Sequence, residues 1–179
     1  MILPIGEVAR TPGAELVVEF SEPLPASDGF DPIGEAHGRL VARNSGEVLS
    51  LSGVVHARVR LACARCLEPF EYAVAAAMEE VGEISSTGLV RNLPDAWPDT
   101  TVIDETTQTV NVSELERQSI VAVLPLREFC RTECRGLCPY CGANRNLAPC
   151  ACVPPRRETP LTHLDRLLAR RHPNPDKRA

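Results

Sequence analysis

The chain has 179 residues, of which 44% are hydrophobic, and a formal net charge of −5 at pH 7. This is enough apolar material for a core in one or two small domains, which argues against full disorder. No apolar run approaches the ~20 residues that a membrane helix needs, and the first ten residues lack the pattern of a secretory signal. We therefore expect a cytoplasmic protein with no membrane partner. In that setting its eight cysteines point to metal or redox chemistry rather than to disulfides.

Charge is distributed unevenly along the chain. Residues 63–129 carry twelve acids and four bases, whereas residues 130–179 carry four acids and ten bases. A basic end on an acidic body is typical of nucleic-acid binding, because phosphates attract the basic end at long range. The alternative is an ordinary solvated tail. If the protein binds RNA, we expect its C-terminal third to do so.

The first half of the chain predicts antiparallel strands. Glu15–Phe20 and Arg39–Arg43 are expected to be short strands on either side of a loop rich in Pro, Gly and Asp. Apolar and polar residues alternate from Val48 to Cys63, and again from Phe70 to Met78, which is the pattern of half-buried strands. The motif Cys63-Ala-Arg-Cys66 lies between the two alternating runs and is therefore expected at the tip of a hairpin.

The second half predicts one helix and a basic tail. Residues 83–106 show little periodicity and are expected to form a long mobile loop, and residues 107–112 are compatible with a strand. Ser113-Glu-Leu-Glu116 has the form of a capping box, which predicts a helix at about 113–124 that packs on the sheet. After the cysteine-rich segment and a proline-rich linker, Thr159-Pro160 begins a second, short helix.

These elements together predict an α+β fold in three parts. Residues 1–129 form an antiparallel β-sheet domain with one packed helix. Residues 130–152 form a small zinc-ribbon-like cysteine module. Residues 153–179 form a basic tail that contains a short helix. The sequence shows no internal repeat and no dinucleotide or phosphate-loop glycine pattern.

The most specific motif is Cys138-Pro-Tyr-Cys141-Gly142. A two-residue gap lets both thiolates reach one ion, and the following Gly relieves the tight turn. Cys150-Ala-Cys152 can supply a second pair and complete a tetrahedral four-sulfur site. Such a site leaves no position for water and is structural rather than catalytic. The segment has little apolar material of its own, so it needs a staple of this kind.

Cys63 and Cys66 form another two-residue pair, whose natural partners are Cys130 and Cys134 just after the predicted helix. Other pairings of the four couples remain open. Two zinc ions are the favoured occupants. The alternatives are an iron–sulfur cluster, which also uses four thiolates, one zinc ion with four free thiols, or a redox dithiol. The redox interpretation is disfavoured because neither pair opens a helix within a strand–helix–strand unit.

The remaining polar residues do not form a recognisable catalytic set. None of the four histidines lies beside a Ser or Cys in a catalytic arrangement; they are His37, His56, His163 and His172. The acid pairs at 79–80 and 104–105 occur in stretches that we expect to be solvated. We therefore expect a protein that is not an enzyme.

The ordered set of motifs resembles the YceD family, whose members are called large ribosomal RNA subunit accumulation proteins. The set comprises the Cys63–Phe70 segment after an alternating strand, the helix end Val123-Leu-Pro-Leu126, and the segment Cys130–Asn146 with its four cysteines and two asparagines. The resemblance covers about residues 48–152. The first forty residues and the 83–106 segment carry no motif and add nothing to it.

The resemblance implies a bacterial, cytoplasmic, non-enzymatic factor of ribosome biogenesis, needed for the accumulation of large-subunit ribosomal RNA. The implied partner is this RNA or its precursor, and a basic ribosomal protein is also compatible. Some family members lack the last four cysteines, which supports two separable sites and the pairing of Cys63 and Cys66 with Cys130 and Cys134. A thiol-based redox enzyme or sensor, and a protein-interaction module without RNA contact, are the alternatives.

Arginines of the C-terminal third are the candidate RNA contacts, because guanidinium forks suit phosphate oxygens. Tyr140 can either stack on an unpaired base or simply cover the metal site. The candidate RNA-binding residues are Arg131, Arg135, Arg145, Arg156, Arg157, Arg166, Arg170 and Arg171.

Overall fold

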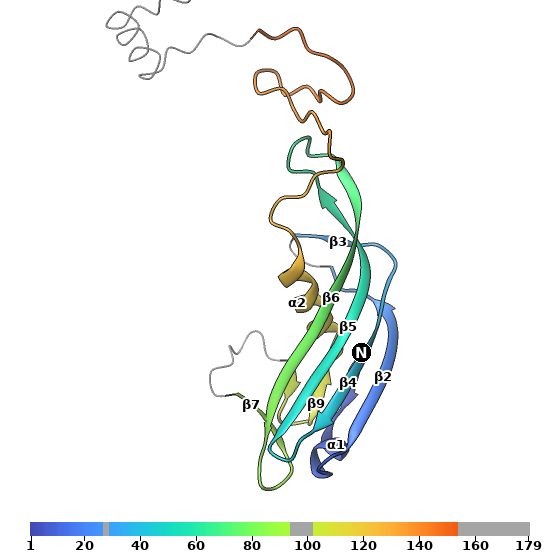
Figure 1. Cartoon of the computed structure of the whole chain (residues 1–179), viewed down its shortest axis with the longest axis vertical. Coiled ribbons are helices and arrows are strands. Elements are labelled where there is room, and N and C mark those ends of the chain that lie inside the picture. Colours follow the sequence, from blue (N-terminus) through green and yellow to red (C-terminus); the bar gives the residue numbers. More distant parts are fainter. Residues whose placement is uncertain (27–28, 94–101, 154–179) are drawn as a thin grey trace, which may run out of the picture. The chain divides into compact units, whose positions relative to one another are not determined.

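The computed structural model describes residues 1–26, 29–93 and 102–153. The chain divides into two compact units, residues 1–134 and residues 135–179. The described helices and strands belong to the first unit (Figure 1). In chain order they are β1 (Ile2–Pro4), α1 (Gly6–Arg10), β2 (Glu15–Pro23), β3 (Asp31–Pro32), β4 (Glu35–Asn44), β5 (Val48–Ala62), β6 (Pro69–Ile84), β7 (Val90–Asn92), β8 (Ile103–Asp104), β9 (Thr109–Asn111) and α2 (Val112–Val123).

The larger sheet is antiparallel, with the strand order β2-β4-β5-β6-β7 and with β3 also paired to β5. Its centre is the long β5–β6 hairpin, which pairs from Val48 opposite Glu83 to Ala62 opposite Pro69. The predicted alternation in β5 is confirmed, because the residues of one face are buried. These residues are Leu49, Leu51, Val55, Ala57 and Val59. The opposite face of the sheet is exposed, as is normal for an antiparallel sheet with one solvated side.

A smaller sheet and α2 pack against the buried face of the larger sheet. The smaller sheet has the order β1-β9-β8, and its residues share one core cluster with those of the larger sheet and α2. Asn44 at the end of β4 is buried and donates its amide hydrogens to the carbonyl oxygens of Val8 and Ala9, each at 2.9 Å. This contact ties α1 to the larger sheet. The α+β class with antiparallel strands and a packed helix is thus confirmed.

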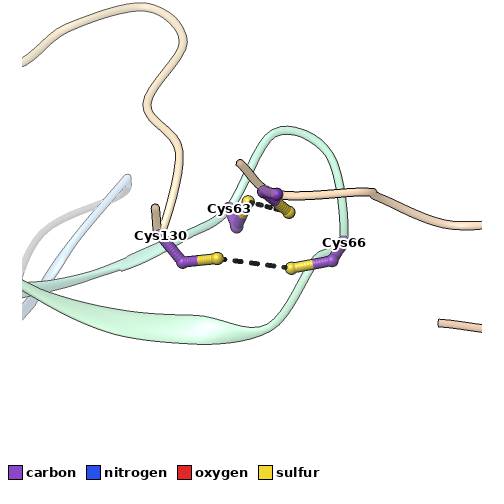
Figure 2. A group of neighbouring side chains, drawn as sticks. Cys63, Cys66 and Cys130 are labelled. Atoms are coloured by element: carbon purple, nitrogen blue, oxygen red, sulfur yellow. Dashed lines mark hydrogen bonds between the residues drawn. The ribbon is translucent and has the colours of Figure 1, made fainter. Parts of the chain in front are cut away.

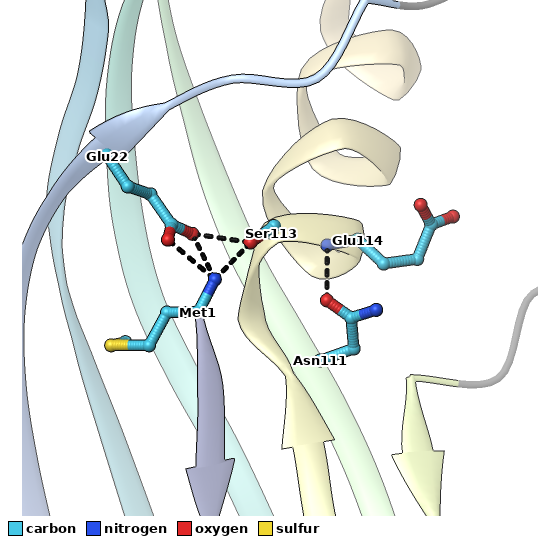
Figure 3. Close-up of polar contacts among 5 residues, drawn as sticks. All are labelled: Met1, Glu22, Asn111, Ser113 and Glu114. Carbon is cyan, nitrogen blue, oxygen red and sulfur yellow. Dashed lines mark hydrogen bonds and ion pairs between the residues drawn. The ribbon is translucent and has the colours of Figure 1, made fainter.

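The structure corrects the predicted helix start. The predicted capping box at Ser113 and Glu116 is wrong, because the cap is Asn111, whose side chain accepts a hydrogen bond from the Glu114 N–H at 3.2 Å (Figure 3). The Ser113 hydroxyl instead donates to Glu22 at 2.6 Å. Glu116 is fully buried. The helix nevertheless spans Val112–Val123, close to the predicted extent.

The expectation of one long loop at 83–106 is wrong where the structure describes strands: residues 83–84 end β6, residues 90–92 form β7 and residues 103–104 form β8. Residues 94–101 of this segment lie outside the described residues. Strands of two or three residues are too short to show a periodic pattern, which explains why β1, β7 and β8 were not predicted. The expected helix after Thr159-Pro160 lies outside the described residues. The division of the chain into three parts stays a prediction.

Candidate metal centres

The eight cysteines form two separate groups of four. In each group the four sulfur atoms all lie within 4.8 Å of one another. The first group, which we call cluster 1, lies wholly in the first unit and consists of Cys63, Cys66, Cys130 and Cys134. The second group, cluster 2, lies wholly in the second unit and consists of Cys138, Cys141, Cys150 and Cys152. The structure therefore groups the cysteines as the sequence analysis preferred.

The tip of the β5–β6 hairpin shapes the first half of cluster 1. The chain turns back on itself because the Cys63 N–H donates to the carbonyl oxygen of Glu68 at 3.0 Å and the Leu67 N–H donates to that of Cys63 at 2.9 Å. Leu67 adopts a left-handed backbone with φ of 61°, which costs free energy in a residue other than glycine. This turn directs both Cys63 and Cys66 toward the chain that follows α2 (Figure 2).

The chain after α2 is fastened to the hairpin tip by contacts beyond the cysteines. The Ala64 N–H donates to the carbonyl oxygen of Glu128 at 2.9 Å. Arg65 donates through Nη1 to the carbonyl oxygen of Cys134 at 3.1 Å, and its guanidinium carbon lies 4.2 Å from the centre of the Phe129 ring. Arg65 therefore holds the second pair of cysteines against the first.

Cluster 1 is almost inaccessible to solvent. Cys63 is 0% exposed and Cys66 and Cys134 are also buried, while Cys130 is half-buried. Burial opposes ionisation of Cys63, but the backbone N–H groups of Cys130, Cys66 and Arg65 outweigh it and lower the pKa of this thiol to about 6. Burial and the neighbouring cysteine side chains raise the pKa of Cys130 to about 12. One thiolate is therefore favoured, whereas four thiolates need a cation among them.

Cluster 2 is built around the same type of turn. The Cys138 N–H donates to the carbonyl oxygen of Ala143 at 2.8 Å, and the Gly142 N–H donates to that of Cys138 at 2.9 Å. Gly142, with φ of 71°, occupies the position that Leu67 has in cluster 1. The two Cys-x-x-Cys motifs thus form equivalent turns, in which backbone N–H groups approach the first sulfur.

Within residues 135–153, the described part of the second unit, polar contacts stand in place of an apolar core. The Asn146 side-chain oxygen accepts from the Arg135 N–H at 2.8 Å, and the Asn144 side-chain oxygen accepts from the Asn146 N–H at 3.0 Å. The Arg145 N–H donates to the carbonyl oxygen of Gly136 at 2.9 Å. These asparagines, which the sequence analysis noted only as part of a motif, close the loop that carries the cysteines.

Cluster 2 is much more exposed than cluster 1. Cys141 and Cys152 are exposed and Cys150 is half-buried, so only Cys138 is buried. The backbone N–H groups of Cys141 and Tyr140 lower the pKa of Cys138 to about 6. The side chain of Cys141, together with burial, raises the pKa of Cys152 to about 12. The electrostatic problem is the same as in cluster 1, since the four sulfurs become thiolates together only around a cation.

The spacing of the sulfurs fits a metal ion. The Sγ atoms of Cys63 and Cys134 are 3.8 Å apart, and those of Cys66 and Cys130 are 3.7 Å apart (Figure 2). A tetrahedron with metal–sulfur distances of about 2.3 Å has edges of about 3.8 Å. Both clusters can therefore hold a metal ion. The close spacing favours one ion in each cluster over a cluster of several irons, which spreads its cysteine ligands over different iron atoms.

The candidate RNA-binding arginines fall into two sets. Arg131, Arg135 and Arg145 are exposed, Arg131 in the first unit and the other two in the second. Arg145 and the half-exposed Tyr140 line the same hollow of about 320 Å³ beside cluster 2. The other candidates lie outside the described residues; they are Arg156, Arg157, Arg166, Arg170 and Arg171.

The buried carboxyl group of Glu116, which lies beside the half-buried Glu22, could not be recognised as such from its motif. Glu116 of α2 interacts with Glu22 of β2. Figure 3 shows that Glu22 also contacts the Met1 ammonium and the Ser113 hydroxyl. Burial and repulsion from Glu22 raise the pKa of Glu116 to about 8. The helical spacing of Glu116 from Val112 and Ile120 was the available signal, because it places this residue on the apolar face.

Residues 51–168 match the family described as large ribosomal RNA subunit accumulation protein YceD. This match covers more than half of the chain. The protein belongs to the YceD family. The matched region contains both cysteine clusters and the hairpin that carries Cys63 and Cys66.

Individual relatives add no stated function. The chain is 32% identical over 152 residues to the uncharacterized protein Rv2926c of Mycobacterium tuberculosis, and equally to the uncharacterized protein Mb2951c of Mycobacterium bovis. The aligned part is 79% of this chain and 69% of each relative. No solved structure matches the chain. Among the described residues, no helix is long and apolar enough to cross a membrane.

Proposed function

We propose that this YceD-family protein is a non-enzymatic factor of the bacterial cytoplasm that supports accumulation of large-subunit ribosomal RNA. It acts by binding that RNA or its precursor through its basic C-terminal part, and a basic ribosomal protein is a further candidate partner. The family description supports the RNA, and the chemistry of the chain supports the mode of binding.

The observation that carries the proposal is the division of charge between the two units. Residues 1–134 contain 21 acidic and 10 basic residues, whereas residues 135–179 contain 3 acidic and 9 basic residues. Phosphate groups are attracted to the second unit and repelled by the first. Binding of RNA is therefore expected to involve one end of the chain rather than its whole surface.

Zinc is the proposed occupant of both clusters. A Zn²⁺ ion bound by four thiolates compensates their charge and closes the site to water, so its role is structural. The burial of Cys63 supports this role over a thiol redox function, because disulfide exchange needs an accessible thiolate. In cluster 2 a separate Zn²⁺ ion holds the short loop on which Arg135 and Arg145 are exposed.

The hollow beside cluster 2 offers chemistry for a nucleotide. The guanidinium of Arg145 can donate to phosphate oxygens, and the half-exposed Tyr140 ring can stack on an unpaired base. Both side chains are carried by a loop that the cysteines and asparagines hold closed. This arrangement is suited to single-stranded parts of a folded RNA, where bases are free to stack.

The experiment is a titration of a large-subunit ribosomal RNA fragment with the zinc-loaded full chain at several salt concentrations. The triple variant Arg131→Ala, Arg135→Ala and Arg145→Ala is expected to bind at least about tenfold more weakly and to reduce the salt slope by about 2 to 3. The matched control removes three exposed arginines from the sheet of the first unit, Arg39, Arg58 and Arg60. The control is expected to leave RNA affinity unchanged or to lower it slightly.

Equal RNA affinity of the wild type and the C-terminal triple variant would contradict the proposed mode of binding. A protein that binds RNA without salt dependence would contradict it as well, since phosphate contacts release counterions. Zinc-free protein whose cysteines cycle between thiol and disulfide would favour the redox alternative.

A further inference from the structure

One edge of the larger sheet is open. β6 pairs with β5 along its whole length, but β7 pairs only with Gly82, Glu83 and Ile84 at its end. Within residues 1–26, 29–93 and 102–153, no other strand pairs with the stretch from Pro69 to Val81. Figure 1 shows β6 on the outer side of β5, with α2 beside it.

The backbone groups along this edge face outward. The Val81 N–H donates to the carboxylate of the neighbouring Glu80 at 3.0 Å, so it points away from the β5 ladder. Every second N–H of a strand points the same way, which places those of Ala73, Ala75 and Ala77 on the open edge. Pro69 belongs to the same set and has no N–H, and a proline is tolerated in a sheet where this group would face outward.

Protection against a further strand is confined to the ends of this edge: Pro69 lies at its start, and the Glu80 carboxylate binds the outward Val81 N–H at the other end, with Ala73, Ala75 and Ala77 between them. Natural sheets protect an edge with lysines, prolines, bulges or a covering element. Between Pro69 and Glu79 the outward-pointing residues of the exposed face include three alanines, which leave room for an incoming chain. α2 runs beside the edge but leaves a groove of about 360 Å³. The groove is lined by Glu79 and Glu80 of β6 and by Leu115, Gln118, Ala122 and Val123 of α2.

The lining of the groove selects a basic occupant. It contains two carboxylates and no basic residue, and the unit around it has 21 acids against 10 bases. Leu115, Ala122 and the exposed Val123 supply an apolar wall. An extended chain places alternate side chains on opposite sides, so one set can contact the apolar wall while the other set approaches the carboxylates.

A second copy of this chain fits the edge less well. Pairing two β6 strands would bring together the four glutamates that each carries, Glu71, Glu79, Glu80 and Glu83. Like charges on paired strands are destabilising. A basic segment removes this repulsion and turns the same glutamates into favourable partners.

We propose that the β6 edge and the adjoining α2 groove bind an extended, arginine- or lysine-rich protein segment as an added strand. Main-chain hydrogen bonds to β6 supply the register, and Glu79 and Glu80 select for basic side chains. The proposal rests on the proposed function for one point, that the segment comes from a ribosomal protein. The binding mode rests on the geometry of the sheet edge.

The test uses the zinc-loaded full chain and a labelled twelve-residue peptide of alternating Arg and Val. Two matched peptides have the same side chains and are methylated on every second backbone nitrogen, one on the odd-numbered and the other on the even-numbered residues. One of the two therefore cannot complete a strand ladder with β6. Fluorescence anisotropy is expected to show binding of the unmodified peptide and at least about tenfold weaker binding of one of the two methylated peptides.

Variants locate the binding to the groove. Glu79→Gln with Glu80→Gln is expected to weaken peptide binding by about tenfold, because two charge partners are lost while their size is kept. The matched control, Glu7→Gln with Glu47→Gln, removes two exposed acids elsewhere in the same unit and is expected to have little effect. Ala75→Arg, at an exposed position on the edge, is expected to repel the peptide and gives an independent second variant.

Several outcomes would overturn the inference. Equal binding of the unmodified peptide and both methylated peptides would show that the peptide binds through its charge alone and adds no strand to the sheet. A full-chain dimer that excludes the peptide would assign the edge to a second copy, and absence of peptide binding would leave no site for such a segment. RNA affinity is measured on the same variants. Loss of peptide binding with unchanged RNA affinity supports the groove, whereas loss of RNA affinity alone concerns only the proposed function.

Discussion

The two cysteine clusters share one local structure and differ in their surroundings. Each starts with a Cys-x-x-Cys turn in which the first cysteine donates and accepts backbone hydrogen bonds across the turn. Cluster 1 is attached to a long hairpin and is buried, with Cys63 at 0% exposure. Cluster 2 belongs to a segment in which two of the four cysteines are exposed and the closing contacts are made by asparagines.

This difference assigns different structural roles to equivalent motifs. The sheet of the first unit has its own aliphatic core, so a metal ion held in cluster 1 would only fasten the chain after α2 to the hairpin tip. In the described part of the second unit few apolar residues are buried, so we expect its order to depend on a metal ion held by the four cysteines. We therefore expect a bound metal ion to add little to the folding free energy of the first unit and to supply most of the folding free energy of the second.

The largest expected effect is that of metal removal. A strong chelator is expected to abolish the order of residues 135–153, because structural zinc supplies ~10 kcal/mol or more to small domains without a core. The β5–β6 hairpin is expected to keep most of its protection, with loss confined to the tip near Cys63. Hydrogen exchange followed by NMR measures both regions in one sample. Equal loss of protection in the two units would contradict the assigned roles.

An effect of intermediate size is expected from Glu116, whose ionisation changes the stability of the first unit alone. The native pKa of about 8 lies above the ordinary value of 4.5, so the native state binds a proton more tightly than the unfolded chain. Stability of the first unit should therefore be highest near pH 5 and fall as the pH rises toward 8. Glu116→Gln removes this dependence and is expected to stabilise the unit by about 2 kcal/mol at pH 8.

Urea unfolding of the zinc-loaded chain at pH 5, 7 and 8 measures the effect of Glu116. The matched control is Glu114→Gln, two residues earlier in the helix, because hydrogen bonding to Arg117 lowers the pKa of Glu114. That variant should not be more stable than the wild type at pH 8. A wild-type stability that rises between pH 5 and 8, with no gain from Glu116→Gln, would show that Glu116 is not kept protonated by its surroundings.

The smallest effects are expected from the left-handed residues of the two turns. Leu67→Gly relieves the strain of a non-glycine residue with φ of 61° and is expected to stabilise the first unit by about 1 kcal/mol, because the Leu67 side chain is 64% exposed. Gly142→Ala introduces the same strain in cluster 2 and is expected to destabilise the second unit by about 1 kcal/mol. Metal affinity and thermal unfolding measure both. Opposite signs are the expected result, and the same sign for both would show that the turns are not equivalent.

Long periodic segments and cysteine spacing were predictable from the sequence. The alternation in β5 and β6 marks one buried face over many residues, and the hairpin it predicts places Cys63 and Cys66 at the tip. The two-residue gaps in the cysteine pairs reflect a local turn, which needs no tertiary information. The sequence therefore predicted the core hairpin and the composition of both candidate sites.

Other features depend on contacts between distant residues and left no local signal. Asn111 rather than Ser113 caps α2, because the Ser113 hydroxyl is occupied by Glu22, about ninety residues earlier in the chain. The small sheet joins strands of two or three residues from the two ends of the first unit. The contact of Arg65 with Phe129 and Cys134 likewise forms only when the hairpin tip meets the chain after α2.

The presence of two separate metal centres is tested most directly by the zinc content per chain of three proteins purified without chelator. These are the wild type, Cys63→Ser and Cys138→Ser. Two independent four-cysteine sites predict about two zinc ions in the wild type and about one in each variant. Cys138→Ser should lose order only in the second unit, and Cys63→Ser only near the hairpin tip. A single ion in the wild type, or loss of all metal in either variant, would contradict two separate metal centres.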